Sequence, residues 1–298
     1  LLDFRSEFKR ARTIRLERNY RSTPEIVRMA NTVLDGAQGR TRAGRLTLVS
    51  QRDAGPPPLV ESFPDDAAEA DGIADRIGAL IAEGRTASEI AILFRTNSQS
   101  EAFEQALTAR GIGYLVRGGD RFFERQEVRR AMVSLRAATR VEQLDPARAV
   151  RDVLSQQGWS EQAPDTTGAI RDRWDSLNAL VGLTDTITAR PGATMADVVR
   201  ELEERAESQA APVVDGVTLA SVHAAKGLEW PVVFVVGASD GLLPISMAKT
   251  PAEVEEERRL FYVALTRARD LLTVSWAAAR TPGARGSRKP SRFLDGVL

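Results

Sequence analysis

The sequence predicts an α/β fold, a doubly wound parallel sheet that is interrupted by an all-helical insertion. Short apolar runs alternate with amphipathic helical patterns between residues 46 and 116. The run at residues 89–95 is almost continuously apolar, as expected for a strand buried on both faces of a parallel sheet. Residues 121–209 carry almost no β signal, and the alternation resumes at residue 217. Strands that alternate with helices of this length favour a doubly wound sheet.

The elements before the insertion follow from apolar periodicity and turn residues. Ser22 or Thr23 can cap a helix that Pro24 opens. A short polar helix precedes the first strand, and residues 38–45 form a polar connector. The predicted strands are residues 13–16, 46–50, 59–63, 89–95 and 114–116, and the predicted helices are residues 25–34, 65–83 and 101–110.

The insertion and the segment after it complete the predicted fold. The insertion carries helical patterns at residues 124–139, 146–157, 169–188 and 195–207. Strands follow at 217–223 and 232–236, then a helix at 255–270, a strand at 271–276 and a basic, glycine-rich tail of uncertain order at 280–298. The predicted organisation is a first α/β part at 1–119, the insertion at 120–212 and a second α/β part with the tail at 213–298.

Composition excludes several classes of function. The 41 basic and 41 acidic residues cancel, so any contact with nucleic acid must be local. The absence of cysteine excludes disulfides and thiolate metal sites, and the single histidine excludes histidine clusters, so no metal site is expected. There is no signal peptide and no run of about 18 apolar residues. A cytoplasmic protein without a membrane role is expected.

Three polar segments stand out against this background. Thr266-Arg267 closes the helix at 255–270, where the guanidinium can reach toward a neighbouring anion. Tyr20 and Arg21 precede a helix N-terminus, which favours anions. The segment at 223–231 lies between two predicted central strands, so we expect its polar residues at one edge of the sheet. Taken alone, each of these residues is more often structural than functional.

Together these segments resemble the conserved motifs of the UvrD/Rep/PcrA group of superfamily 1 DNA helicases. Residues 16–23 (LERNYRST) are similar to motif IV, 221–231 (SVHAAKGLEWP) to motif V and 255–270 to motif VI. Residues 91–100, together with 118–125, match a further segment of the family. Ser221 stands where the family usually has threonine, and Trp230 where phenylalanine is commonest. The resemblance implies a RecA-like second motor domain (2A) with an inserted subdomain (2B).

The resemblance also implies roles for individual residues. Around the nucleotide, Tyr20 would stack on adenine, Arg21 and Arg267 would act as arginine fingers, Glu229 would bind the ribose, and Gly227 would allow close backbone approach. A second group would face single-stranded DNA. It comprises Arg95, Thr96, Asn97, Ser221 and His223.

The family's ATP site needs residues that this sequence does not contain. There is no G-x-x-x-x-G-K-[ST] phosphate loop and no acidic pair after a strand to hold Mg²⁺. The resemblance therefore implies a fragment of an ATP-dependent 3′-to-5′ single-stranded DNA translocase and helicase in repair or replication. ATP with Mg²⁺ would bind against an N-terminal RecA-like partner (1A/1B), and the fragment alone would be inactive.

Two alternative functions stay open at this point. One is a non-catalytic, helicase-derived DNA-binding or interaction module, and the other is the helicase part of a RecB-like nuclease complex. The insertion is shorter than is usual in the family and lacks the Gly-Ile-Gly helix-hairpin-helix string by which family members grip duplex DNA. The short insertion and Trp230 together suggest an atypical actinobacterial UvrD-like branch.

Overall fold

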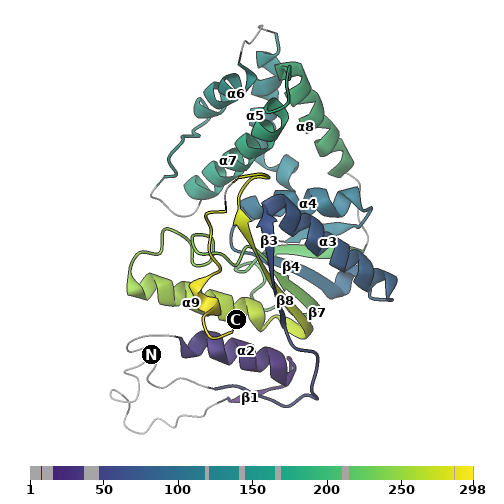
Figure 1. Ribbon diagram of the computed structural model, residues 1–298, viewed down its shortest axis with the longest axis vertical. Coiled ribbons are helices and arrows are strands. Elements are labelled where there is room, and N and C mark those ends of the chain that lie inside the picture. The colour runs from purple at the N-terminus through teal and green to yellow at the C-terminus, as the bar shows by residue number, and fades with distance from the viewer. Residues whose placement is uncertain are drawn as a thin grey trace.

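The computed structural model describes residues 8, 16–36, 47–117, 121–140, 145–164, 169–209, 215–284 and 286–297. An α/β body carries a helical subdomain at one end, at the top of the view in Figure 1. None of the helices in these ranges is long and apolar enough to cross a membrane.

A six-stranded parallel sheet forms the centre of the α/β body, in the order β3-β8-β7-β4-β6-β5. The predicted parallel sheet is therefore confirmed. The strands are β3 (Leu59–Asp65), β4 (Ile90–Phe94), β5 (Tyr114–Arg117), β6 (Val217–Ser221), β7 (Trp230–Val235) and β8 (Ala268–Ala279). Two residues of β1 (Arg18–Asn19) pair in parallel with β2 (Val49–Ser50) in a separate small sheet.

Helices cover both faces of the sheet. On one face lie α2 (Pro24–Asp35) and α9 (Pro251–Leu265), and on the other lie α3 (Asp66–Ala82) and α4 (Ser100–Ala109). Strand β4 shows why its sequence is continuously apolar: Leu93 packs into the first core and Ile92 into the second. Each face of a central strand must be apolar when both are covered.

The insertion is helical and has its own hydrophobic core. Its helices are α5 (Gln126–Ala138), α6 (Pro146–Ser155), α7 (Ala169–Thr188) and α8 (Met195–Gln209), close to the predicted ranges. Phe122, Leu177 and Leu202 are fully buried in that core. The predicted boundaries at 119/120 and 212/213 lie outside the described residues.

Several predicted element ends were wrong. Helix α9 stops at Leu265, and Arg269 belongs to β8 rather than to the last helical turn. Strand β6 ends at Ser221 and not at residue 223. Residues 13–15 and the connector at 38–45 lie outside the described part, and Leu16 precedes β1 without belonging to a strand.

The C-terminal segment is packed against the body instead of forming a loose tail. The short 3-10 helix η5 (Arg292–Leu294) places Phe293 in the core, where its ring stacks on Phe261 at a centroid distance of 6.2 Å. The guanidinium of Arg258 lies 4.6 Å from the centre of the Phe293 ring. The uncertain order predicted for this segment is thus corrected by tertiary packing that its basic, glycine-rich composition does not reveal.

Candidate functional site

The junction between α9 and β8 positions Arg267. Helix α9 begins with a capping box, in which Thr250 and Glu253 satisfy each other's backbone N–H groups. At the other end, Arg267 donates from Nε to the carbonyl of Val263 at 3.0 Å and from Nη1 to the carbonyl of Leu228 at 2.9 Å. These bonds attach the guanidinium to one carbonyl at the helix end and one in a neighbouring loop.

The loop before α2 is attached to the start of β8. The side chain of Asn19 shapes the loop by accepting from the N–H groups of Arg21 and Ser22, both at 2.9 Å. The Ser22 hydroxyl donates to the carbonyl of Ala268 at 2.6 Å, and the N–H of Thr23 donates to the carbonyl of Arg269 at 3.1 Å. The backbone that carries Arg21 is thereby held beside the backbone that follows Arg267.

Arg21, Glu229 and Arg267 consequently converge at the amino ends of β7 and β8, which are paired at Trp230 and Ala268. Arg21 forms an ion pair with Glu229 and donates to the carbonyl of Thr266 at 3.3 Å. Burial lowers the pKa of the Arg267 guanidinium, and the nearby charge of Arg21 lowers it further. We call Tyr20, Arg21, Glu229 and Arg267 the amino-edge cluster.

Tyr20, a member of this cluster, is exposed to solvent, and Gly227, which precedes Glu229 by two residues, lies in a turn. The side chain of Tyr20 is 69% exposed, although an aromatic ring of this size normally buries much of its surface. Gly227 has φ of +87°, which favours glycine, and a Cβ there would meet nothing within 4 Å. The glycine is therefore needed for the turn of the loop and leaves open space beside it.

The second group of predicted site residues lies at the opposite edge of the sheet. Phe94 pairs with Ser221, so the residues after β4 and β6 are neighbours. The side-chain oxygen of Gln99 accepts from the N–H groups of Arg95 and Thr96 at 3.1 and 2.9 Å. We call Arg95, Thr96, Asn97, Ser221 and His223 the carboxyl-edge cluster.

The prediction that the polar residues of the loop at 223–231 share one edge was therefore wrong. Ser221 and His223 lie at the carboxyl edge, whereas Glu229 lies at the amino edge. Because β6 and β7 are parallel, the connection between them must cross the sheet from one edge to the other.

Arg95 is held by an acidic residue of α9. Its guanidinium donates to the Glu257 carboxylate through Nε at 2.9 and 3.1 Å and through Nη2 at 2.7 Å. The two side chains are only 17% and 7% exposed. Glu257 also accepts from the N–H of Ile245 at 3.2 Å. This pairing neutralises the positive charge of Arg95.

Sequence reasoning missed three residues that hold these clusters together. Glu257 pairs with Arg95, and Arg52 binds the backbone of the amino-edge cluster. Arg125, from the start of the insertion, donates to the carbonyl of Asn97 at 3.0 Å and to the Ser100 hydroxyl at 2.9 Å. Arg52 and Arg125 could not be identified from the sequence because every residue has a backbone carbonyl. Glu257 could not be distinguished from the other acidic residues near the predicted start of its helix.

The amino-edge cluster can bind an anion joined to a flat ring. Arg21 and Arg267 provide two guanidinium groups, and Tyr20 provides an exposed aromatic face. The ion pair between Arg21 and Glu229 is 32% and 41% exposed, and such pairs contribute about 0–1 kcal/mol. Replacing Glu229 by a phosphate as the partner of Arg21 therefore costs little free energy.

Comparison with known proteins identifies relatives of the chain. Residues 14–144 and 147–279 match the family described as the UvrD-like helicase C-terminal domain. Over 306 aligned positions and all of this chain, the sequence is 50% identical to ATP-dependent DNA helicase UvrD2 of Mycobacterium tuberculosis, and it covers 43% of that protein. The chain thus spans less than half the length of this relative.

A more distant relative is also covered only in part. DNA helicase II of Escherichia coli is 29% identical over 370 aligned positions, covering 98% of this chain and 51% of that protein. Because 370 positions exceed the 298 residues of this chain, the relative has segments that the chain lacks. A solved C-terminal domain of a possible DNA helicase from Lactobacillus plantarum has a TM-score of 0.40 and 17% identity, covering 89% of this chain and 91% of that one.

Proposed function

The chain belongs to the UvrD-like helicase C-terminal domain family, and we propose that it is the second motor half of an ATP-dependent 3′-to-5′ single-stranded DNA translocase and helicase. In this proposal an N-terminal RecA-like partner (1A/1B) supplies the phosphate loop and the Mg²⁺ ligands. This chain supplies one wall of the nucleotide cleft and part of the DNA path. The functional domains are 2A, at 1–119 and 213–298, and 2B, at 120–212.

The observation that supports the proposal most strongly is the convergence of Arg21 and Arg267. They are 246 positions apart in sequence, yet Arg21 donates to the carbonyl of Thr266, next to Arg267. Burial is the main cause of the lowered pKa of Arg267, and the positive charge of Arg21 adds to it, whereas the carboxylate of Glu229 offsets part of this repulsion. A phosphate bound beside the two guanidinium groups would offset the rest.

ATP with Mg²⁺ supplies the phosphoryl group whose transfer releases the energy for movement. Arg21 and Arg267 would stabilise charge on the γ-phosphate, a role typically worth about 10³–10⁵ in rate. Tyr20 would stack on the adenine with about 0.5–1.5 kcal/mol beyond area burial. Glu229 would accept a hydrogen bond from the ribose, and Gly227 leaves room for the nucleotide beside the loop.

The carboxyl-edge cluster would face single-stranded DNA. Thr96, Asn97, Ser221 and His223 are polar and partly or fully exposed, and they come from adjacent strands. Polar groups along such an edge can donate to phosphate and sugar oxygens. DNA and nucleotide would thus bind at opposite edges of one sheet.

The test is Arg267→Ala in the full-length protein. We expect DNA-stimulated ATP hydrolysis to fall by about 10³-fold or more, since the guanidinium acts on transition-state charge, while DNA affinity changes little. Arg259→Ala is the matched control, because Arg259 lies on the same helix in an exposed pair with Glu256. Steady-state ATPase rates and fluorescence anisotropy with labelled oligonucleotide provide the two measurements.

Substantial turnover by the R267A protein would contradict the finger assignment. If the unsubstituted full-length protein hydrolyses no ATP but still binds single-stranded DNA, the chain is instead a helicase-derived binding module without catalysis.

A further inference from the structure

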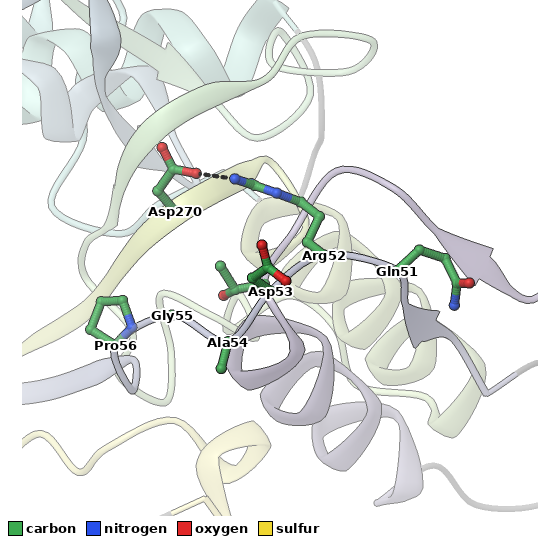
Figure 2. Close-up of a pocket in the computed structure, with 8 residues that line it drawn as sticks. Gln51, Arg52, Asp53, Ala54, Gly55, Pro56 and Asp270 are labelled. Carbon is green, nitrogen blue, oxygen red and sulfur yellow. Dashed lines mark ion pairs between the residues drawn. The ribbon is translucent and has the colours of Figure 1, made fainter.

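Arg52 lies just after β2 and contacts both segments that carry the proposed arginine fingers. Its Nη1 donates to the carbonyl of Arg21 at 2.7 Å and to the carbonyl of Arg269 at 2.9 Å. Its Nη2 pairs with Asp270 at 2.8 Å. The dashed line between the two side chains in Figure 2 marks this ion pair. One guanidinium therefore connects the loop before α2 with the first residues of β8.

The segment around Arg52 is itself fastened to the same loop. The N–H of Gln51 donates to the carbonyl of Asn19 at 2.7 Å. The Ser50 hydroxyl donates to the carbonyl of Ser22 at 2.8 Å and accepts from the N–H of Arg52 at 3.1 Å. Arg52 thus projects from a backbone whose position relative to Arg21 is already fixed.

The charge of Arg52 is compensated locally. Asp270 is partly buried and lies in the wall of a pocket of about 360 Å³, which Asp53 also lines. With its guanidinium engaged by a carboxylate and two carbonyls, Arg52 acts on the backbone rather than on a phosphate. A planar group with several fixed donors can span two carbonyls and a carboxylate in a way that a lysine ammonium cannot.

We propose that Arg52 is a positioning residue, which holds the backbones of Arg21 and of the residues following Arg267 in the register that both arginine fingers need. This inference rests on the function proposed above. The carbonyl of Arg269 accepts from both Thr23 and Arg52, so it joins the loop, β8 and the Arg52 segment at one atom. Without Arg52, the bonds of Ser22 and Thr23 to β8 remain, but the carbonyl of Arg21 loses its link to the carbonyl of Arg269.

The experiment compares Arg52→Ala and Arg52→Lys in the full-length protein by ATPase kinetics. A misplacement of about 1 Å can cost about 10²-fold in rate, so for the R52A protein we expect kcat to fall about 10- to 100-fold. The KM for ATP and the affinity for single-stranded DNA are expected to stay within about threefold, because the fingers act in the transition state. The R52K protein can keep one carbonyl contact, so its kcat should lie between those of the R52A protein and the unsubstituted protein.

Arg76→Ala is the matched control, because Arg76 also forms an ion pair with an acid, Glu61, but contacts neither finger segment. A kcat of the R52A protein within about threefold of that control would overturn the proposal. An equal loss of kcat and DNA affinity would also overturn it, because such a loss indicates a general structural defect. The proposal would fail as well if the R52K protein were no more active than the R52A protein. If the R52A protein does not fold, the R52K protein carries the test alone, and an unchanged kcat overturns it.

The R267A protein, assayed in parallel, distinguishes a failure of the proposed function from a failure of the role proposed for Arg52. If it retains turnover, the proposed function fails. If it is inactive while the R52A protein matches its control, only the role of Arg52 fails.

Discussion

The ion pair between Arg95 and Glu257 gives a quantitative prediction for the carboxyl-edge cluster. Glu257→Gln keeps the shape of the side chain but removes the negative charge that neutralises Arg95. Arg95 is 17% exposed, so its guanidinium can still reach solvent and become available to a DNA phosphate. We expect the E257Q protein to bind single-stranded DNA more tightly at low salt and to show a steeper salt dependence.

The magnitude follows from counterion release. One additional phosphate contact with a single strand increases the slope of log affinity against log salt by about 0.7. Between about 50 and 200 mM salt, this difference makes the loss of affinity about threefold greater than in the unsubstituted protein.

Fluorescence anisotropy of the full-length protein with labelled oligothymidine, measured across this salt range, tests the prediction. Glu256→Gln is the control, because Glu256 lies on the same helix and the substitution changes net charge equally, but its partner is the exposed Arg259. Equal slopes for the E257Q and E256Q proteins would refute the reasoning and place Arg95 away from the DNA path.

Two further predictions concern stability. Phe293→Ala removes a fully buried ring that stacks on Phe261 and should cost about 3–5 kcal/mol in urea unfolding, whereas a loss below about 1 kcal/mol would show that the C-terminal segment is not docked. Burial raises the pKa of Glu69 to about 7, while its carboxylate accepts from Gly237 and Ser275. The folded protein therefore favours the neutral carboxyl, and this contribution to the free energy of unfolding is fully present below the unfolded pKa of about 4.5 and is lost as pH rises through 7. Glu69→Gln should remove about 3 kcal/mol of the pH dependence of the unfolding free energy between pH 5 and 8. Parallel pH profiles of the two proteins would contradict this.

The elements that the sequence predicted well are those whose own residues determine them. Strand β4 was recognisable because every residue from Ile90 to Phe94 is apolar, and only a strand covered on both faces needs this. The insertion helices were recognisable from their periodicity, and α6 also from Pro146 at its first turn.

What the sequence did not reveal depends on contacts between distant segments. The packing of Phe293 could not be predicted because the few apolar residues of a basic, glycine-rich stretch show no periodicity. Arg52 was missed because its partners include backbone carbonyls, which every residue has. The convergence of Arg21 and Arg267 was predicted from motif resemblance, and its physical cause is the attachment of the Ser22–Thr23 backbone to β8.

Helix α9 and the residue that follows it contact both clusters. Glu257 holds Arg95 near the carboxyl edge, and nine residues later the carbonyl of Thr266 accepts from Arg21 at the amino edge. Nine residues of α-helix span about 13 Å, and Phe261 anchors the middle of the helix in the core. Because a packed helix moves as a rigid body, a shift of Glu257 also moves the start of the segment that carries Arg267. Release of Arg95 in the E257Q protein should therefore change the ATPase kcat as well as DNA affinity, whereas the E256Q protein should change neither. A change in DNA affinity alone would show that the two edges act independently.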